Sequence, residues 1–360
     1  MPQSAEDDDE NPFRPPWETE DDPEPPGAPP RSRKSPTQPD YSHPLLTPLA
    51  SAENALARLQ AKTEAASAAV AEGLRTRLSF LEAAGWLRHV HFAIHPLDLA
   101  LREYGAVTSY GAAAHGDRLG AALPWTTAQE GELEVAPSDI TVGVALRYAR
   151  QWQRLGEHRS WHPLESVGAL REALHSRGTN DAEIADFLAS IRCLEQGPVL
   201  IRAGRAASEW MNLPGINQQS PDGVFVGSCL WQESNRRSPI SLPFWSAPEH
   251  RHHRMSLKFG VGRLAEFLEC VTASAIVGLR ELERLQEIEK KGRLIASTKR
   301  SRLPDAVDAV LRLHIVTAAT LAKAIKVTPQ AATALLRQLI AAGVVREATG
   351  QASWRAFMLT

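Results

Sequence analysis

Apolar residues at helical spacing run along the chain from about residue 45, and this pattern limits the fold more than any other feature. Leu74, Leu78 and Leu81 recur on one helix face, for example. Alternating β-branched runs, the usual sign of strands, are scarce before residue 340. The sequence therefore predicts an all-α body whose helices are separated by loops rich in glycine and proline.

The same spacing predicts two further helices in the middle of the chain. One has the apolar stripe Ile140, Val144, Tyr148, Trp152 and Leu155. The other starts at Asn180-Asp181 and ends at Gly197-Pro198. Residues 105–137 and 212–260 are the least regular stretches and are expected to hold loops.

The longest candidate helix extends from Gly262 to about Ala296. Its apolar stripe consists of Leu264, Leu268, Val271, Ala275, Leu282, Leu285 and Ile288. The pairs Glu287–Lys291 and Glu289–Arg293 have the favourable order for ion pairs four residues apart. The stripe is either core or the interface of a homodimer, for which the sequence offers no other candidate.

The two ends of the chain carry opposite charge, although the total is only −2. Residues 1–40 contain 11 acidic and 4 basic residues (net −7), with 11 of the 25 prolines. We therefore expect residues 1–43 to be a disordered acidic tail, which either solubilises the chain or masks its basic end. Residues 280–360 contain 7 acidic and 14 basic residues (net +7), so nucleic acid is expected there.

Several functional classes find no support in the residues. The three cysteines share no metal-type spacing, and no apolar run is long enough to span a bilayer. The sequence contains no phosphate-binding glycine loop and no nucleophile elbow. We predict a cytoplasmic protein, at the nucleoid when bound to DNA, with no catalytic residue, cofactor or metal.

Histidine and tryptophan clusters have two interpretations each. His91 and His95 could present two imidazoles on one helix face near His89, but no third metal ligand is evident and Pro96 favours a helix boundary. Residues 250–254 form a cationic cluster that is either a phosphate-facing loop or a solvated one. Three tryptophans are expected in the core rather than on a base-stacking surface: Trp210, Trp231 and Trp245.

Residues 303–360 are predicted to form three helices followed by a two-stranded wing. The helix boundaries are Leu303-Pro304-Asp305 for the first helix, Thr317 for the second, and Thr328-Pro329 and Gly343 for the two ends of the third. Residues 344–347 and 354–357 flank the turn 349–351 and predict a hairpin. A helix, a tight turn and a second helix allow the second helix to enter the major groove of DNA.

The third helix of this module carries the chemistry that reads base edges. Its apolar side is predicted to comprise Val327, Ala332, Leu336, Leu339 and Ile340. On its outer side, Gln330 can contact adenine, Arg337 guanine or phosphate, and Thr333 either, while Ala334 leaves room for a thymine methyl group. The predicted phosphate contacts are Thr328, Gln351, Ser353 and Arg355, together with Lys299, Arg300 and Arg302 of a flexible basic linker.

Residues 317–359, with these caps, spacings and hairpin in order, resemble winged helix-turn-helix domains. The segments AASEWMNLPG, GSCLWQESNRRSPISLPFWS, GRLAEFLECVTASAIVGLRELERL and SRLPDAVDAVLR resemble a family of uncharacterised helix-turn-helix proteins of alphaproteobacterial chromosomes and rhizobial plasmids. That resemblance covers about the last 160 residues. It implies a helical domain of unknown function followed by a DNA-binding domain.

The order of helices before the winged helix is also similar to the C-terminal part of Fic proteins, which transfer AMP to hydroxyl side chains. Fic chemistry requires a His-Pro-Phe start and a Gly-Asn-Gly-Arg anion nest. His43-Pro44, His95-Pro96 and His162-Pro163 lack the following Phe and the nest, and PDGVFVGSCLW lacks both histidine and arginine. The resemblance therefore implies, as the alternative to a DNA-binding regulator, a non-catalytic scaffold or protein-interaction module that could bind a nucleotide.

These observations predict an all-α body with a C-terminal winged helix, and a transcriptional regulator that binds double-stranded DNA. The expected organisation is a tail (1–43), a first helical region (44–160), a helical domain (161–296), the basic linker (297–302) and the winged helix (303–360). The target sequence, any effector, and whether the protein represses, activates or maintains a plasmid do not follow from the residues.

Overall fold

A computed structural model describes residues 44–92, 94–104, 139–157, 160–174, 179–194, 197–217, 219–236, 238–247, 261–296, 301–349 and 355–360. Pro44–Thr360 form one compact unit. The helices described, in chain order, are α1 (Leu46–Ala65), α2 (Ala68–His89), α3 (Pro96–Glu103), α5 (Asp139–Glu157), α6 (Val167–Ala173), α7 (Asp181–Arg192), α8 (Val199–Met211), α9 (Asp222–Ser234), α10 (Val261–Ile295), α11 (Leu303–Arg312), α12 (Ala318–Ile325) and α13 (Pro329–Ala341). The strands β1 (Val345–Glu347) and β2 (Phe357–Leu359) pair antiparallel, with Val345 opposite Leu359.

The predicted fold class is confirmed: a helical body precedes three helices and a hairpin. The predicted tail, residues 1–43, lies outside the described residues. The expected domain boundaries stay a prediction. Within the described ranges, no helix is long and apolar enough to cross a membrane.

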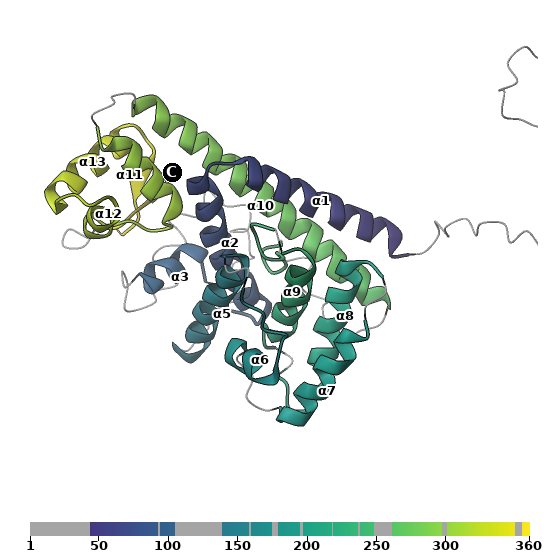
Figure 1. Cartoon of the computed structure of the whole chain (residues 1–360). Helices are drawn as coiled ribbons and strands as arrows, with labels where there is room; N and C mark the ends of the chain where they lie inside the picture. The colour runs from purple at the N-terminus through teal and green to yellow at the C-terminus, as the bar shows by residue number, and fades with distance from the viewer. Residues whose placement is uncertain are drawn as a thin grey trace, which may run out of the picture. The chain divides into compact units, whose positions relative to one another are not determined.

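The long helix α10 is the central element of the fold. α1 lies along it, and α2, α8 and α11 also pack against it (Figure 1). Its predicted apolar stripe, from Leu264 to Ile288, is buried. The stripe is therefore core, because neighbouring helices of the same chain cover it. A homodimer, if formed, needs another surface.

One sequence expectation in the body is incomplete and another is wrong. Residues 212–260 hold loops, as expected, but they also contain α9, whose residues from Asp222 to Gln232 are all buried. A helix that is buried on all sides gives no one-sided periodic signal, which explains why α9 was not expected. Ile140 is 81% exposed, although it continues the stripe of α5. It lies in the first turn of the helix, beyond the reach of the core.

A buried carboxylate organises the body. Glu82 on α2 accepts hydrogen bonds from the backbone N–H groups of Phe244 (3.0 Å), Trp245 (2.7 Å) and Ser246 (3.0 Å). Burial raises the pKa of Glu82, and the hydrogen bonds from residues 244–246 oppose this rise. The carboxylate thereby supplies the partners that this non-helical segment would otherwise lack in the core.

The C-terminal module docks on α2 through a close backbone approach and a buried arginine. A Cβ atom built on Gly73 would lie 2.1 Å from the carbonyl oxygen of Leu311, so only glycine allows this distance. One turn later, Arg77 donates to the carbonyls of Leu311 (2.6 Å) and Leu313 (3.2 Å) at the end of α11. A cation at this helix end satisfies unpaired carbonyls and interacts favourably with the helix dipole.

α10 holds the same module from another side. A Cβ on Gly292 would lie 2.7 Å from the side chain of Val307, so α10 and α11 are also in close contact. Lys291 donates to the carbonyl of Gly343 (2.9 Å), and Arg293 pairs with both Glu289 and Asp308. The Glu289–Arg293 pair is thus confirmed, while Lys291 binds a main-chain oxygen of the module.

Candidate nucleic-acid interface

Helix α12 has the boundaries that the sequence predicts. The side chain of Thr317 accepts a hydrogen bond from the backbone N–H of Thr320, and the Thr320 hydroxyl accepts one from the backbone N–H of Thr317, which completes a capping box. The helix ends at Ile325, and its C-cap Lys326 has a left-handed backbone (φ +54°). The three residues 326–328 lead to α13, so the two helices are joined by a tight turn.

Helix α13 begins as expected and faces the core with one side. Thr328 caps it by accepting from the backbone N–H of Ala331 (3.2 Å), and Pro329 occupies its first turn. The residues buried on this helix are Ala332, Leu335, Leu336 and Leu339. The expectation for Ile340 is wrong, because it is 38% exposed, and Leu335 packs inside instead.

The opposite side of α13 is what we call the recognition face: Gln330, Thr333, Ala334 and Arg337. Gln330, Ala334 and Arg337 are exposed, and Thr333 is half-buried with its hydroxyl donating to the carbonyl of Pro329 (2.9 Å). Positions 330, 333, 334 and 337 fall on one helix side. This arrangement presents an amide, a methyl group and a guanidinium, which are groups that can contact base edges.

The recognition face lies in a long segment without carboxylates. No Asp or Glu occurs between Asp308 and Glu347. Lys323 and Lys326 are exposed at the end of α12 and add two cations to this segment. We did not predict these two lysines as contacts, although the absence of acidic residues around them could have indicated them.

Two of the predicted phosphate contacts are engaged within the module. Arg302 donates to the carbonyl of Ile325 at the end of α12 and pairs with Asp305 (2.7 Å). Arg355 pairs with Glu347, and its guanidinium lies 5.7 Å from the Phe357 ring centroid. Four other predicted contacts lie outside the described residues: Lys299, Arg300, Gln351 and Ser353.

The second strand of the wing is hydrogen-bonded to the segment just before α12. Val316 and Phe357 exchange backbone hydrogen bonds of 2.8 and 2.7 Å next to the β1–β2 pair. The second strand is Phe357–Leu359, later than the expected residues 354–357. Phe357 and Leu359 are buried on the core side, and this alternate burial sets the strand's position.

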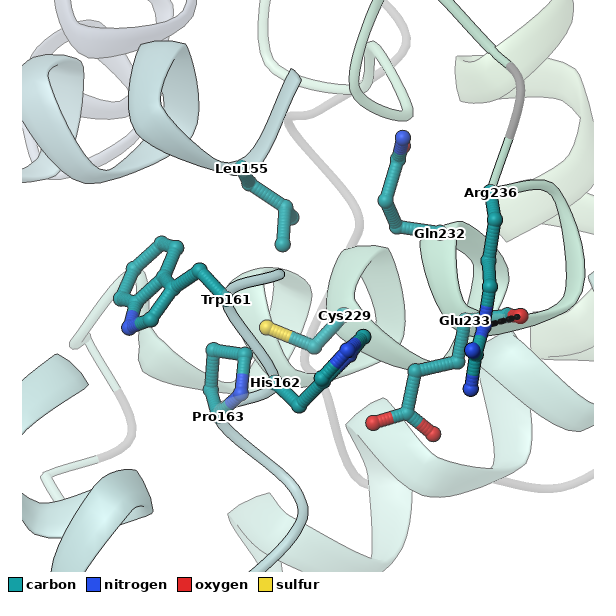
Figure 2. Close-up of a pocket in the computed structure, with 8 residues that line it drawn as sticks. All are labelled: Leu155, Trp161, His162, Pro163, Cys229, Gln232, Glu233 and Arg236. Atoms are coloured by element: carbon teal, nitrogen blue, oxygen red, sulfur yellow. Dashed lines mark hydrogen bonds between the residues drawn. The ribbon is translucent and has the colours of Figure 1, made fainter. Parts of the chain in front are cut away.

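A small pocket in the body contains groups that resemble a catalytic set (Figure 2). His162, Cys229 and Glu233 line it, together with Pro163 of one of the three His-Pro pairs. Its volume is about 10 Å³, which is the space of one water molecule. Burial raises the pKa of the Cys229 thiol well above its usual range and also raises the pKa of Glu233. Burial therefore opposes formation of the thiolate, which is the nucleophilic form of cysteine.

The other candidate clusters of the sequence have structural roles or lie outside the described residues. His95 caps α3 by accepting from the backbone N–H of Leu97 (3.1 Å), and His91 has a left-handed backbone between the two helices. Among the described residues, no cluster of histidine, cysteine and acidic groups could hold a metal. Trp210, Trp231 and Trp245 are buried, as expected. The cluster 250–254 lies outside the description.

Comparison with known proteins identifies the class of the module. Residues 303–359 match a family model described as an HTH DNA binding domain. The chain therefore carries a helix-turn-helix DNA-binding domain at its C-terminus, in the form of a winged helix.

The chain is also similar to the uncharacterised protein y4cF of Sinorhizobium fredii (strain NBRC 101917 / NGR234), with 25% identity over 185 residues. This match covers 49% of the chain and 47% of the relative, so the chain spans about half the length of the curated relative it matches. A Fic family protein from Desulfovibrio desulfuricans G20 is a structural neighbour with a TM-score of 0.41 and 10% identity. The alignment covers 88% of this chain and 96% of that one.

Proposed function

We propose that the protein is a transcriptional regulator that binds double-stranded DNA with α13 in the major groove and the wing beside it. The observation that carries this proposal is the recognition face, which is polar and lies in a segment free of carboxylates. Backbone phosphates attract such a surface, and Gln330 and Arg337 are suited to base edges. This role requires no catalytic step and places the protein in the cytoplasm, at the nucleoid.

Phosphate contacts and base contacts have different signatures, which a point variant can separate. We expect Arg337→Ala to weaken binding to double-stranded DNA. A phosphate contact predicts a uniform loss across sequences and a salt slope smaller by about 1, whereas a base contact predicts a loss of about 1–3 kcal/mol on the specific site only. The measurement is DNA affinity by fluorescence anisotropy over a salt series, with random and genomic fragments.

Arg205→Ala is the matched control, because Arg205 is exposed on α8, outside the module. Deletion of the module is a poorer test, since it would leave the buried Arg77 without the carbonyls it binds. Equal DNA affinity of wild type and Arg337→Ala at every salt concentration would show that α13 does not contact DNA.

A further inference from the structure

A cavity of about 120 Å³ lies where the body meets the wing. The body contributes residues of α2, α3 and α10 to its lining, and the module contributes residues of the loop after α11 and of both strands. The polar part of the lining consists of Arg77, His95, Glu281, Arg284, His314, Arg346 and Thr360. The apolar part consists of Leu81, Pro96, Leu97 and Met358.

The charged side chains of the lining do not balance. Three arginines face one side-chain carboxylate, Glu281, which already pairs with Arg284 (2.9 Å) and lies 3.5 Å from Arg77. Arg284 also donates to the main-chain oxygen of Thr360 (2.9 Å). Burial lowers the pKa of Arg346, and the positive charge of Arg284 lowers it further. Burial also lowers the pKa of His314 well below its usual range, and Arg77 and Arg284 add to this effect. Arg346 is therefore the lining arginine without an acidic partner among the described residues, and an anion in the cavity would supply one.

Two buried nitrogens of the module's lining residues have no hydrogen-bond partner among the described residues. They are Nδ1 of His314 and Nε of Arg346. A buried donor without a partner destabilises the fold, so such atoms call for a bound acceptor. A neutral imidazole can donate from one nitrogen, and guanidinium donates from Nε, so one carboxylate could accept from both. In contrast, Arg77 and Arg284 already bind main-chain oxygens.

We propose that this cavity binds a small organic carboxylate, with its charged group at Arg346 and His314 and its hydrocarbon part against Leu97 and Met358. The apolar lining favours a hydrocarbon body over an inorganic oxyanion. A cavity of roughly 150 Å³ accommodates the six carbons of benzene, so about 120 Å³ accommodates a ligand of about five or six heavy atoms. Butyrate has this size and serves as the probe.

The position of the cavity also gives it a regulatory role, and this part rests on the proposed DNA binding. A bound carboxylate contacts the wing through Arg346 and Met358 and the body through Leu97, so it fixes the wing against the body. We expect saturating butyrate to change DNA affinity by about fivefold or more at constant ionic strength.

Binding is tested first without DNA, on the full chain. Calorimetric titration and thermal melting are carried out with sodium butyrate, sodium phosphate and sodium chloride at equal ionic strength. We expect butyrate to give a saturable rise in Tm, as ligand linkage requires, and phosphate to give less. Arg346→Met should weaken butyrate binding at least about tenfold, because it removes a charge-assisted hydrogen bond. Arg205→Met is the control and should bind as wild type.

Each outcome decides a part of the proposal. Equal titration curves for wild type and Arg346→Met, with both proteins folded at 25 °C, would overturn the site. Equal binding of phosphate and butyrate would overturn the carboxylate assignment. Butyrate binding without a change in DNA affinity would overturn the regulatory role alone. A chain that binds butyrate but no DNA at any salt concentration would contradict the proposed function and leave the site standing.

Discussion

Cationic side chains lie on both sides of the C-terminal module, but their surroundings are opposite. On the side toward the body, Arg77, Arg284 and Lys291 donate to main-chain carbonyls of the module. On the side of the recognition face, Arg337 and Lys326 are exposed in a segment without carboxylates. The cations on the side toward the body (the inward cations) bind the module to the body. Those on the side of the recognition face (the outward cations) are exposed and can contact a polyanion.

This comparison shows what a net charge can indicate. The excess of basic residues in 280–360 marks the DNA-binding end of the chain, yet several of these residues are engaged within the protein. Arg293, Arg302, Arg312 and Arg355 all form ion pairs with acidic residues. Substitutions on the inward side should therefore change stability, and substitutions on the outward side should change DNA affinity.

The largest effect on stability is expected from Arg77→Met. The variant leaves the carbonyls of Leu311 and Leu313 at the end of α11 without this donor. Because a buried acceptor left unpaired costs about 1–3 kcal/mol, the loss of both bonds should lower the free energy of unfolding by about 3–5 kcal/mol. Urea unfolding at pH 7 measures this loss. Arg312→Met is the control: Arg312 is exposed and pairs with Glu72 at 3.3 Å, so its loss should cost less than about 1 kcal/mol. Equal effects would contradict the distinction between a buried and an exposed cation at the contact between the module and α2.

The free energy of unfolding should depend on pH through Asp98, a buried residue of α3 in the body. Burial raises the pKa of Asp98 from 3.8 to about 7, so the folded state holds this proton more tightly than the unfolded state. Its contribution to stability is therefore complete below pH 3.8 and is lost as the pH rises to about 7. The slope is at most about 1.4 kcal/mol per pH unit.

Asp98→Asn should remove this part of the pH dependence. The measurement is the free energy of unfolding from about pH 4 to pH 8, compared between the variant and wild type. His314 acts in the opposite direction, since its lowered pKa costs stability as the pH falls. If Asp98→Asn and wild type give parallel curves, Asp98 does not titrate in this window.

Gly73→Ala should cost about 1–3 kcal/mol, because its Cβ would overlap the Leu311 carbonyl and push α11 away from α2. The matched control is Gly143→Ala on α5, where a Cβ would meet nothing within 4 Å. In this control the better helix propensity of alanine should stabilise the protein by about 0.5–1 kcal/mol. Thermal melting of both variants gives the comparison, and a loss of the same size in both would exclude the close approach as the cause.

Lys326→Gly is expected to have the smallest effect on stability. Unlike Arg77→Met and Gly73→Ala, it should stabilise the protein. Lys326 has a left-handed backbone that glycine adopts without strain, so the variant should gain about 1 kcal/mol. It also removes one outward cation, so the salt slope of DNA binding should fall by about 0.9 if Lys326 contacts a phosphate. Lys323→Ala removes a cation without this backbone gain and serves as the control. A stabilised variant with an unchanged slope would show that Lys326 is not a contact.

Local signals account for the parts of the fold that sequence reasoning placed correctly. Thr317, Thr328 and Pro329 set helix starts in the module through contacts within four residues along the chain. Helix α9 was missed because its burial on all sides removes the one-sided pattern. The wing strand was misplaced because its alternation covers only three residues.

The sequence alone determined the class of the fold, the helix boundaries of the module and the residues of its outer side, because caps and periodicity act between near neighbours. The tertiary structure decided which charges are available. Glu82 meets Phe244, and Arg77 meets Leu311, across separations of 162 and 234 residues. No local pattern encodes such pairs, because burial and partners depend on which helices pack together. The cavity at the wing follows for the same reason, since its lining comes from both parts of the chain.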